Sequence, residues 1–410
     1  MTIEDPALPA AVHLLGDGAW GLIAAGLAAL DGELQRLEPA QVIYRPGSEL
    51  TVRYDATVRW ADGHVADEVL CVGTTRKGAP EGTVPLVAEG LEAGLWRYPF
   101  DPALPGLEAA VTAPGVAAVA GAIVGSRPEL TMRAYRPGRR AVVHATGDQG
   151  EAYLKVVRLK VFDAMVATHH ALAAAGLPVP DVLAGDPATG ILVLRAMPGD
   201  GLRDRLRSGS RPWPDAAEVL AVLDRLAEVE PVPGMDPVSP ISQGVATHLT
   251  MLERALGVTD PVIDELRGVL VDGWSAHFPE PVQPVSLIHG DLHEAQLLVD
   301  RGAITGVLDI DGVGPGDRVD DLGRFLGHLS ALALGSRGHR SAVDAYVDGL
   351  RDDFARSVDV EELDRRAASV VAGLAVGPFR VQMDGWQDET HRRLALARWW
   401  ATHRTAERPN

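Results

Sequence analysis

The stretch LIHGDLHEAQLL, residues 287–298, places two histidines, two acids and a glutamine in a segment that otherwise reads as a buried strand leading into a turn. The apolar run ends in a tight turn at Gly290, and Asp291 follows that turn directly. A second apolar run, AITGVLDID at 303–311, begins soon afterwards and ends in acids. We expect the two runs to pair as a hairpin, which would bring their acidic ends together.

Such a cluster has the side chains that a hard divalent cation prefers. Gln296 and Asp309 offer oxygens to Mg²⁺, and Asp311 is a possible further ligand. Asp291 is then free to act on a substrate that the cation helps to hold. The stretch therefore predicts a metal-assisted reaction at the ends of two strands.

Length, charge and cysteine content limit the kinds of protein that this chain can be. With 410 residues, 46% of them hydrophobic, it can form two or three globular units. Its 38 basic and 56 acidic residues give a net charge of −18, which disfavours nucleic acid and anionic membranes as partners. Cys71 is the only cysteine, which excludes disulfides within the chain and thiolate metal clusters. An acidic start and the lack of a run of about 18 apolar residues predict a cytoplasmic protein.

Hydrophobic periodicity predicts strands mainly in the first half of the chain and helices in the second. The first half is expected to form a helix over 12–38, strands over 41–60 and 67–74, a boundary region over 115–127, a hairpin from 135, a helix over 158–175, and strands over 176–183 and 190–202. The second half is expected to form helices over 214–229, 243–256, 260–276, 320–335, 341–355, 360–376 and 379–404.

Two turns share the sequence Tyr-Arg-Pro-Gly, starting at Tyr44 and at Tyr135, 91 residues apart. An alternating strand follows each of them. The pattern indicates either a duplicated unit or one turn solution used twice, and four identical residues do not decide between these.

The segment HGDLHEAQLL, followed by GVLDIDGVGPGDRVDDLG, resembles the catalytic and metal-binding loops of the aminoglycoside phosphotransferase and choline kinase group. The resemblance implies the bilobal protein-kinase-like fold of that group. It also implies that Asp291 is the catalytic base and Asp309 the principal magnesium ligand, with His289 and Asp321 supporting the loop. Gln296 stands where the group has Asn, and this makes the chain similar to actinobacterial glucosamine kinases and maltokinases. The group's Gly-Asp-Pro is replaced by a Gly-Asp-Arg that ends in Arg318, which the resemblance does not explain.

A kinase-like site also requires residues for the nucleotide. Lys155 in EAYLKVV is expected to contact the phosphates, under a turn over 136–141 that includes Arg136. The next helix lacks a glutamate to hold this lysine, so Asp163 is the nearest candidate and His169 a weaker one. Adenine would pair with the backbone of the interlobe strand, formed by Leu194, Arg195, Ala196 and Met197.

The acceptor pocket is predicted from the segment PFRVQMDGWQDE. Gln382, Trp386 and Glu389 stand at i, i+4 and i+7, so one helix would present them on one face. An indole can stack on a sugar ring, an amide can bind hydroxyls and a carboxylate can bind an ammonium group. The same residues resemble the sugar-binding signature of glucosamine kinases. The alternative is that Trp386 belongs to the core and that Glu389 is on the solvated side.

Together these observations predict an α+β, bilobal protein-kinase-like chain with an extra α/β N-terminal cap. The cap is expected over 1–115, the β-rich N-lobe over 116–202 and the helical C-lobe over 203–410. The predicted activity is ATP- and Mg²⁺-dependent phosphorylation of a sugar hydroxyl by a monomer or homodimer, with glucosamine as acceptor. Alternatives are an aminoglycoside or maltose kinase and a kinase-like binding protein with weak activity; a metal hydrolase lacks enough histidines at ligand spacing.

Overall fold

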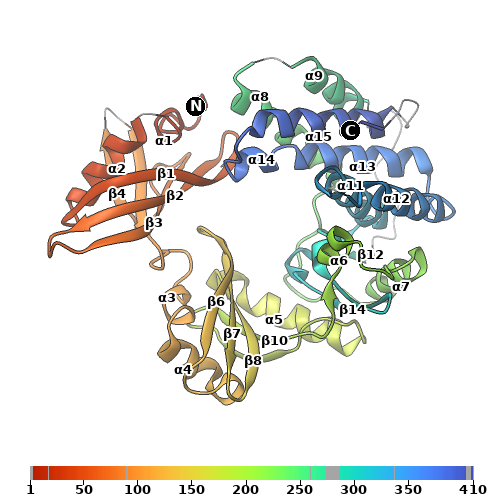
Figure 1. Cartoon of the computed structure of the whole chain (residues 1–410), viewed down its shortest axis with the longest axis horizontal. Helices are drawn as coiled ribbons and strands as arrows, with labels where there is room; N and C mark the ends of the chain where they lie inside the picture. Colours follow the sequence, from red (N-terminus) through yellow and green to blue (C-terminus); the bar gives the residue numbers. More distant parts are fainter. Residues whose placement is uncertain are drawn as a thin grey trace.

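The computed structural model describes residues 3–16, 18–88, 91–258, 260–273, 286–336, 338–402 and 408–409. Two five-stranded sheets form the N-terminal half and a set of helices forms the C-terminal half. Figure 1 shows the first sheet on the left, the second sheet at the bottom and the helices on the right. The predicted α+β class, with a β-rich N-terminal part and a helical C-terminal part, is confirmed.

The first sheet has the strand order β1-β2-β3-β5-β4 and is antiparallel between all neighbours. Its elements are α1 (Ala11–Leu14), α2 (Gly18–Ala28), β1 (Gly32–Arg45), β2 (Glu49–Trp60), β3 (Val65–Thr75), β4 (Val84–Ala88) and β5 (Leu91–Arg97). The strands predicted over 41–60 and 67–74 are confirmed. The single helix predicted over 12–38 is instead the two helices α1 and α2, and it is wrong beyond Ala28, where a turn that ends at Asp31, with a φ of 59°, leads into β1. Leu34 then satisfies the alternation of a strand as well as the spacing of a helix.

The second sheet repeats this order as β6-β7-β8-β10-β9. Its elements are α3 (Leu107–Ala110), α4 (Ala113–Val124), β6 (Glu129–Arg136), β7 (Arg140–Gly147), β8 (Gly150–Val157), α5 (Leu159–Ala174), β9 (Val182–Asp186) and β10 (Ile191–Arg195). The predicted boundary region over 115–127 is largely the helix α4. The predicted division between cap and N-lobe at 115/116 falls inside this helix.

The Tyr-Arg-Pro-Gly turns have the same construction in both sheets. The hydroxyl of Tyr44 donates to Asp5 Oδ2 at 2.7 Å, and Gly47 N donates to the same oxygen at 2.7 Å. The hydroxyl of Tyr135 and Gly138 N donate to Asp101 Oδ2 in the same way, at 2.9 and 2.7 Å.

The two aspartates also begin identical segments. The sequence DPALP occurs at 5–9 and at 101–105, each before the two short helices that precede a sheet. Matching strand order, turn and leading segment together identify the two sheets as copies of one unit. Sequence reasoning noticed only the turns, although DPALP was visible in the chain.

The copies differ where a kinase-like N-lobe carries its chemistry. Lys155 pairs across the sheet with Val142, seven residues after the tyrosine of its turn. The residue seven after Tyr44 is Thr51, and it pairs with Gly73. The first copy therefore has glycine in place of the lysine, and no counterpart of α5 lies between its third and fourth strands.

The C-terminal half is helical, as predicted, and contains two small sheets around the acidic stretch. Its helices are α6 (Leu202–Ser208), α7 (Ala216–Ala227), α8 (Ile241–Leu256), α9 (Pro261–Arg267), α11 (Arg318–Gly335), α12 (Arg340–Phe354), α13 (Val360–Leu374), α14 (Gly377–Arg380) and α15 (Trp386–Ala401). Its strands are β11 (Asp200–Gly201), β12 (Ser286–Ile288), β13 (Leu297–Asp300), β14 (Ala303–Val307) and β15 (Gly314–Gly316). Among the described residues, no helix is long and apolar enough to cross a membrane.

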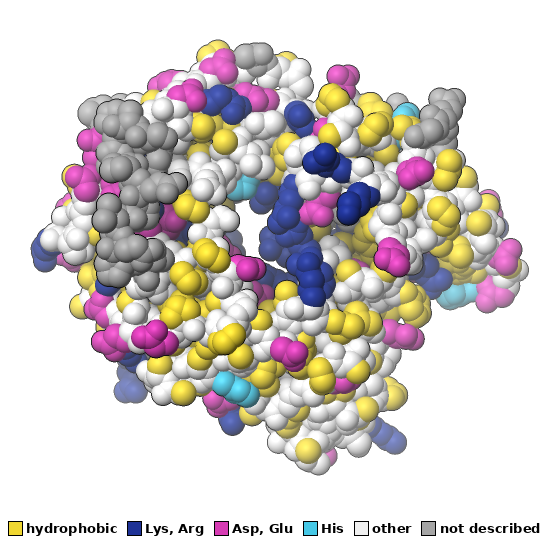
Figure 2. Space-filling view, turned by 180° about the vertical axis from the view of Figure 1, so that it is seen from behind, with side chains coloured by type: hydrophobic (Ala, Val, Ile, Leu, Met, Phe, Trp, Pro, Cys, Tyr) yellow, Lys and Arg dark blue, Asp and Glu magenta, His cyan; other side chains and the backbone are white. Residues whose placement is uncertain are grey.

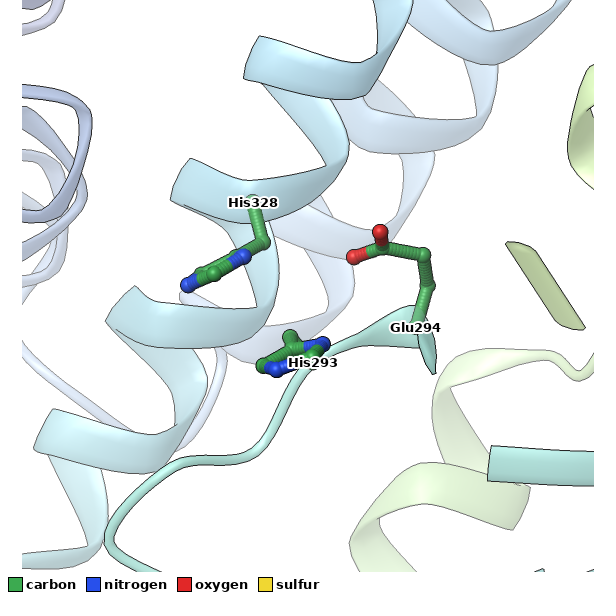
Figure 3. A group of neighbouring side chains, drawn as sticks. All are labelled: His293, Glu294 and His328. Carbon is green, nitrogen blue, oxygen red and sulfur yellow. The ribbon is translucent and has the colours of Figure 1, made fainter. Parts of the chain in front are cut away.

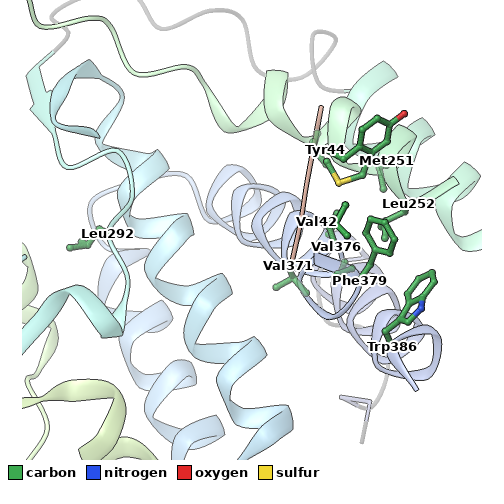
Figure 4. Close-up of a cluster of buried hydrophobic side chains, with 14 of the residues drawn as sticks. Val42, Tyr44, Met251, Leu252, Leu292, Val371, Val376, Phe379 and Trp386 are labelled. Atoms are coloured by element: carbon green, nitrogen blue, oxygen red, sulfur yellow. The ribbon is translucent and has the colours of Figure 1, made fainter. Parts of the chain in front are cut away.

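The first sheet packs against the helical half through a shared apolar core. Val42 and Tyr44 of β1 lie beside Met251, Leu252 and Phe379 of the helices (Figure 4). These side chains belong to one continuous buried cluster. The first sheet and the helical half therefore share a continuous hydrophobic core.

Candidate active site

The loop that carries Asp291 is fixed by a buried carboxylate. Asp321, at the start of α11, is fully buried and accepts hydrogen bonds from His289 N at 2.6 Å and Gly290 N at 2.9 Å. The ring of His289 lies 3.0 Å from the carbonyl of Leu308, which ties the loop to the next acidic segment. Gly290 has a φ of 77°, and a Cβ there would lie 2.4 Å from Gly312 O. The turn predicted at Gly290 thus needs glycine for both backbone and space.

The strands on either side of the loop pair differently from the predicted hairpin. The strand before the loop, β12, pairs with β15, and β14 pairs with β13, which starts after Gln296. The prediction of a direct hairpin is wrong because β13 was not recognised. The acidic residues still meet, because the segment 308–311 lies on the connection from β14 of one strand pair to β15 of the other.

Asp309 and Asp311 converge on one ammonium group. Nζ of Lys155 lies 3.1 Å from Asp309 Oδ1 and also bonds Asp311. Arg140 lies 2.6 Å from Asp309 and 2.9 Å from Asp311, and the amide of Gln296 lies 3.3 Å from Asp309 Oδ2. Residues from both halves of the chain therefore form one charged cluster.

This cluster suits a divalent cation. Burial alone would raise the pKa of Asp309, but Lys155 and Arg140 outweigh it and hold that pKa well below its usual value. Asp309 stays ionised in a left-handed backbone conformation with a φ of 55°, which aims its carboxylate into the cluster. The two carboxylates already share the cationic groups of Lys155 and Arg140, and an amide lies beside them, so the donor set fits Mg²⁺.

Asp291 differs from the other acids because it is exposed. About half of its side chain, 52%, is accessible, and its Oδ2 lies 4.0 Å from Nε2 of His293. Its backbone N donates to Nδ1 of His289 at 3.3 Å. A fixed backbone with an uncommitted carboxylate is what a group that accepts a proton from a substrate requires.

His293 and Glu294, which follow Asp291, lie beside His328 of α11 (Figure 3). The rings of His293 and His328 stack at 4.4 Å with an interplanar angle of 11°, and Glu294 lies beside them. Glu294 is 1% exposed and its Oε1 accepts from Arg203 at 2.7 Å. The stacking on His328 and the ion pair with Arg203 therefore tie this part of the loop to α11 and α6.

The partner predicted for Lys155 on the next helix is wrong. Asp163 is exposed on α5, and the structure pairs Lys155 with Asp309 and Asp311 instead. His169 is buried, and its Nδ1 lies 2.8 Å from the carbonyl of Pro180. Lys155 is thus paired with carboxylates of the C-terminal half, and not with an acid on the next helix.

The predicted interlobe strand is present as β10 and the residues after it. Leu194 is buried in the sheet, whereas the N–H of Arg195 donates to Asp181 O at 2.9 Å and is already used. Among the described residues, the N–H groups of Ala196 and Met197 donate to no backbone carbonyl. Within the predicted set, these two residues keep backbone donors for an adenine ring.

The predicted acceptor face on one helix is not formed. Gln382 lies between α14 and α15 with a φ of 49°, and its amide donates to Phe379 O at 2.6 Å. Trp386 is 8% exposed and packs edge-on against Phe379 with 5.2 Å between ring centroids, as Figure 4 illustrates. Glu389 pairs with Arg392 and Arg393. The helix predicted over 379–404 is broken after Arg380, so Gln382 lies outside α15 and does not join Trp386 and Glu389 on one helical face.

The Asp-Arg that replaces Asp-Pro is explained by ion pairs. Asp317 caps α11 by accepting from Val319 N at 2.9 Å and also accepts from Arg366 at 2.8 Å. Arg318 pairs with Asp224 of α7. The substitution therefore connects α11 to neighbouring helices and leaves the acidic cluster unchanged.

Sequence reasoning missed the arginines that surround the site. Arg140 was visible only as part of a turn, and its pairing with Asp309 depends on lobe packing that no local pattern reports. Figure 2 shows Lys and Arg side chains gathered along one wall of a hollow near the centre of the face drawn there. A cavity of about 560 Å³ is lined by four arginines, namely Arg45, Arg136, Arg139 and Arg380.

Comparison with known families now identifies the chain. A model described as the phosphotransferase enzyme family matches residues 131–368. The chain belongs to this family. The match begins in the second sheet and ends in α13, so it contains all the acidic cluster, and the fold is the protein-kinase-like fold of this family.

Solved structures of similar proteins include several phosphotransferases. A thermostable mutant of aminoglycoside phosphotransferase APH(4)-Ia, in ternary complex with AMP-PNP and hygromycin B, is 15% identical with a TM-score of 0.47, over 68% of this chain and 95% of that chain. Macrolide 2'-phosphotransferase MphH from Brachybacterium faecium is 17% identical with a TM-score of 0.39, over 66% of this chain and 93% of that chain. The comparison with curated proteins gives no match.

Proposed function

We propose that this phosphotransferase moves the γ-phosphoryl group of ATP to a hydroxyl of a sugar or sugar-like small molecule, with Mg²⁺ as the metal. The observation that carries the proposal is the position of an exposed Asp291 on a braced loop, next to Asp309, Asp311 and Gln296. Phosphoryl transfer needs positioning and charge neutralisation, and this arrangement offers both.

Each residue of the cluster has a proposed role. Asp291 accepts the proton of the attacking hydroxyl, and Asp321 holds its loop in place. Lys155 neutralises nucleotide phosphates when these displace its present carboxylate partners. Asp309, Asp311 and Gln296 hold the metal, which when bound supplies charge neutralisation to the phosphates. The turn that contains Arg136 covers the nucleotide, and the backbone of Ala196 and Met197 receives adenine.

Glucosamine is the specific acceptor proposed from the sequence. Its support is the resemblance of Gln296 and of the Gln382, Trp386 and Glu389 set to glucosamine kinases. The contacts of these three late residues favour the core interpretation, so the acceptor class has more support than the amine does. An aminoglycoside or maltose is the alternative acceptor.

A screen with labelled ATP tests the proposal. The intact protein is incubated with ATP, Mg²⁺ and glucosamine, glucose, maltose or an aminoglycoside, and phosphorylated product is measured. Asp291→Asn should lower kcat by about 10²- to 10⁴-fold and leave AMP-PNP binding and the melting temperature unchanged. Asp300→Asn is the matched control, because Asp300 is similarly exposed, at 55%, on the nearby β13. Nucleotide binding without any product would indicate a kinase-like binding protein instead.

A further inference from the structure

The cavity of about 560 Å³ is enclosed by three separate parts of the molecule. The first Tyr-Arg-Pro-Gly turn contributes Arg45, and the second contributes Arg136 and Arg139. Helix α8 contributes His248, and α14 contributes Arg380. The volume is in the range of sites for small molecules.

The arginines of this cavity are poorly neutralised. Arg45 and Arg139 share one carboxylate, that of Glu49, at 3.5 and 2.6 Å. Among the described residues, the guanidinium groups of Arg136 and Arg380 have no carboxylate or hydrogen-bond acceptor. Four guanidinium groups thus line the cavity and, within the described part of the chain, no carboxylate does, although the net charge is −18.

The charges of these arginines lower one another's pKa. Burial, together with the charges of Arg136, Arg139 and Arg45, lowers the pKa of Arg380 to about 10. Burial and the charges of Arg140 and Arg139 likewise lower the pKa of Arg136. Uncompensated like charges in a partly desolvated cavity destabilise the empty protein, and an anion would relieve this cost.

The cavity reaches the catalytic side of the site. The charges of Asp291 and Asp309 act on Arg136 and partly offset the lowering of its pKa. Arg136, which lines the cavity, is therefore close enough to Asp291 and Asp309 to be influenced by their charges. Arg45 and Arg380 line the cavity from the cap and from α14, whereas the nucleotide is proposed to bind between the second turn and β10.

The duplication supplies a reason for this placement. In each turn an aspartate accepts hydrogen bonds from a tyrosine hydroxyl and a glycine N–H. Each arginine therefore extends from a turn that is held by the same hydrogen bonds. In the proposed function the second turn faces nucleotide phosphates. The first copy has lost the lysine position, to Gly73, but keeps an arginine-bearing turn aimed at the same cavity.

We infer that this cavity binds an anionic group of the acceptor, a phosphate monoester or a carboxylate, with Arg380 and Arg45 as its principal ligands. The inference rests on the proposed function and refines its substrate class to an anionic sugar or polyol. It replaces the amine as the recognised group, because an ammonium ion would be repelled by four neighbouring guanidinium groups.

Matched acceptors test the inference. Glucose, glucosamine, glucuronate and glucose 1-phosphate share a pyranose ring and differ in charge. Wild-type protein should use at least one of the two anionic sugars with a kcat/KM at least about tenfold above glucose, since one charge-assisted contact accounts for such a ratio. Arg380→Gln and Arg45→Gln should each raise the KM for that sugar about fivefold or more and leave the KM for ATP within about twofold.

The control and the contrary results are defined by the same assay. Arg356→Gln removes an arginine whose side chain is 79% exposed in the turn that follows α12, and it should change neither KM. Preference for glucose or glucosamine would overturn the inference. A rise in the KM for ATP alone in Arg380→Gln would also overturn it, because the arginines would then serve the nucleotide.

Direct binding separates this inference from the proposed function. Calorimetry with glucose 1-phosphate and with glucuronate, in the presence of AMP-PNP and Mg²⁺, should show binding to the wild type that Arg380→Gln weakens. Binding of an anionic sugar without any phosphorylated product would contradict the proposed function and keep the anion site. Product formation without a preference for anionic sugars would support the proposed function and contradict the anion site. Absence of binding by both sugars would overturn the anion site.

Discussion

Arg140 occupies the carboxylates that a divalent cation would need. It contacts both oxygens of Asp309, at 2.6 and 2.9 Å, and one of Asp311. A cation that enters this cluster must therefore displace the guanidinium group. Arg140→Gln should lower the Mg²⁺ concentration for half-maximal activity several-fold, and calorimetric Mg²⁺ binding should tighten in parallel. Weaker Mg²⁺ binding in the variant would mean that Arg140 shapes the site instead of competing for it.

His248, which lines the arginine-rich cavity, makes the free energy of unfolding of the protein depend on pH. Burial, with the nearby charges of Arg380 and Arg324, lowers its pKa from 6.5 to about 4. Between these values the unfolded chain binds more protons than the folded one, so stability rises with pH through this window and is lost as pH falls from 6.5 to 4. His248→Gln should reduce this slope by an amount bounded at about 3 kcal/mol over the window. Urea unfolding at pH 7 and pH 5 measures it, and an unchanged difference would contradict the assignment.

At the scale of single elements, the Tyr-Arg-Pro-Gly turns depend on one buried acid each. Asp101 is 4% exposed and accepts from Tyr135, Gly138 and Ala103. Asp101→Ala should cost about 2–4 kcal/mol of unfolding free energy, because three donors lose their acceptor in a buried setting. It should also raise the KM for ATP, since the turn over the nucleotide loosens. Asp352→Ala, at a position whose side chain is 72% exposed, should change stability by less than about 0.5 kcal/mol.

The elements also mark how far sequence reasoning reaches. The stretch around Asp291 was predictable because turn, acid and spacing are local, and the strands over 41–60 were predictable because alternation is local. The break between α14 and α15 was not predictable, because the composition of this segment suits a helix. The helix is interrupted by Gln382, which has a left-handed backbone conformation, and by Gly385, which is the N-cap of α15. The partner of Lys155 was missed for another reason, since it comes from residues more than 150 positions away. Pairings that depend on how the lobes meet leave no local trace.

At the scale of the whole molecule, the first copy connects both lobes around the site. Glu49 of its turn pairs with Arg139 of the N-lobe, and its Asp5 and Tyr44 bond Arg254 of α8 in the C-lobe. The cap is thus placed to fix the angle between the lobes that Lys155 and Asp309 join from the other side. The first sheet thus contacts both the N-lobe and the C-lobe, and it also contributes Arg45 to the cavity.

Removing the connection to the C-lobe tests this arrangement. Asp5 has a side chain that is 1% exposed, and its pKa is lowered because hydrogen bonds from Gly47, Tyr44 and Ala7 and the charge of Arg254 outweigh the effect of burial. Arg254→Met leaves that carboxylate buried without its cation, which should cost about 3–5 kcal/mol in urea unfolding. Arg356→Met, at an exposed surface position, should cost less than about 0.5 kcal/mol. Because the cap and the helices share one apolar core, tryptophan fluorescence and far-ultraviolet circular dichroism should still report a single transition in the variant. A separate early transition of the cap would show that this ion pair, and not the shared core, couples the cap to the lobes.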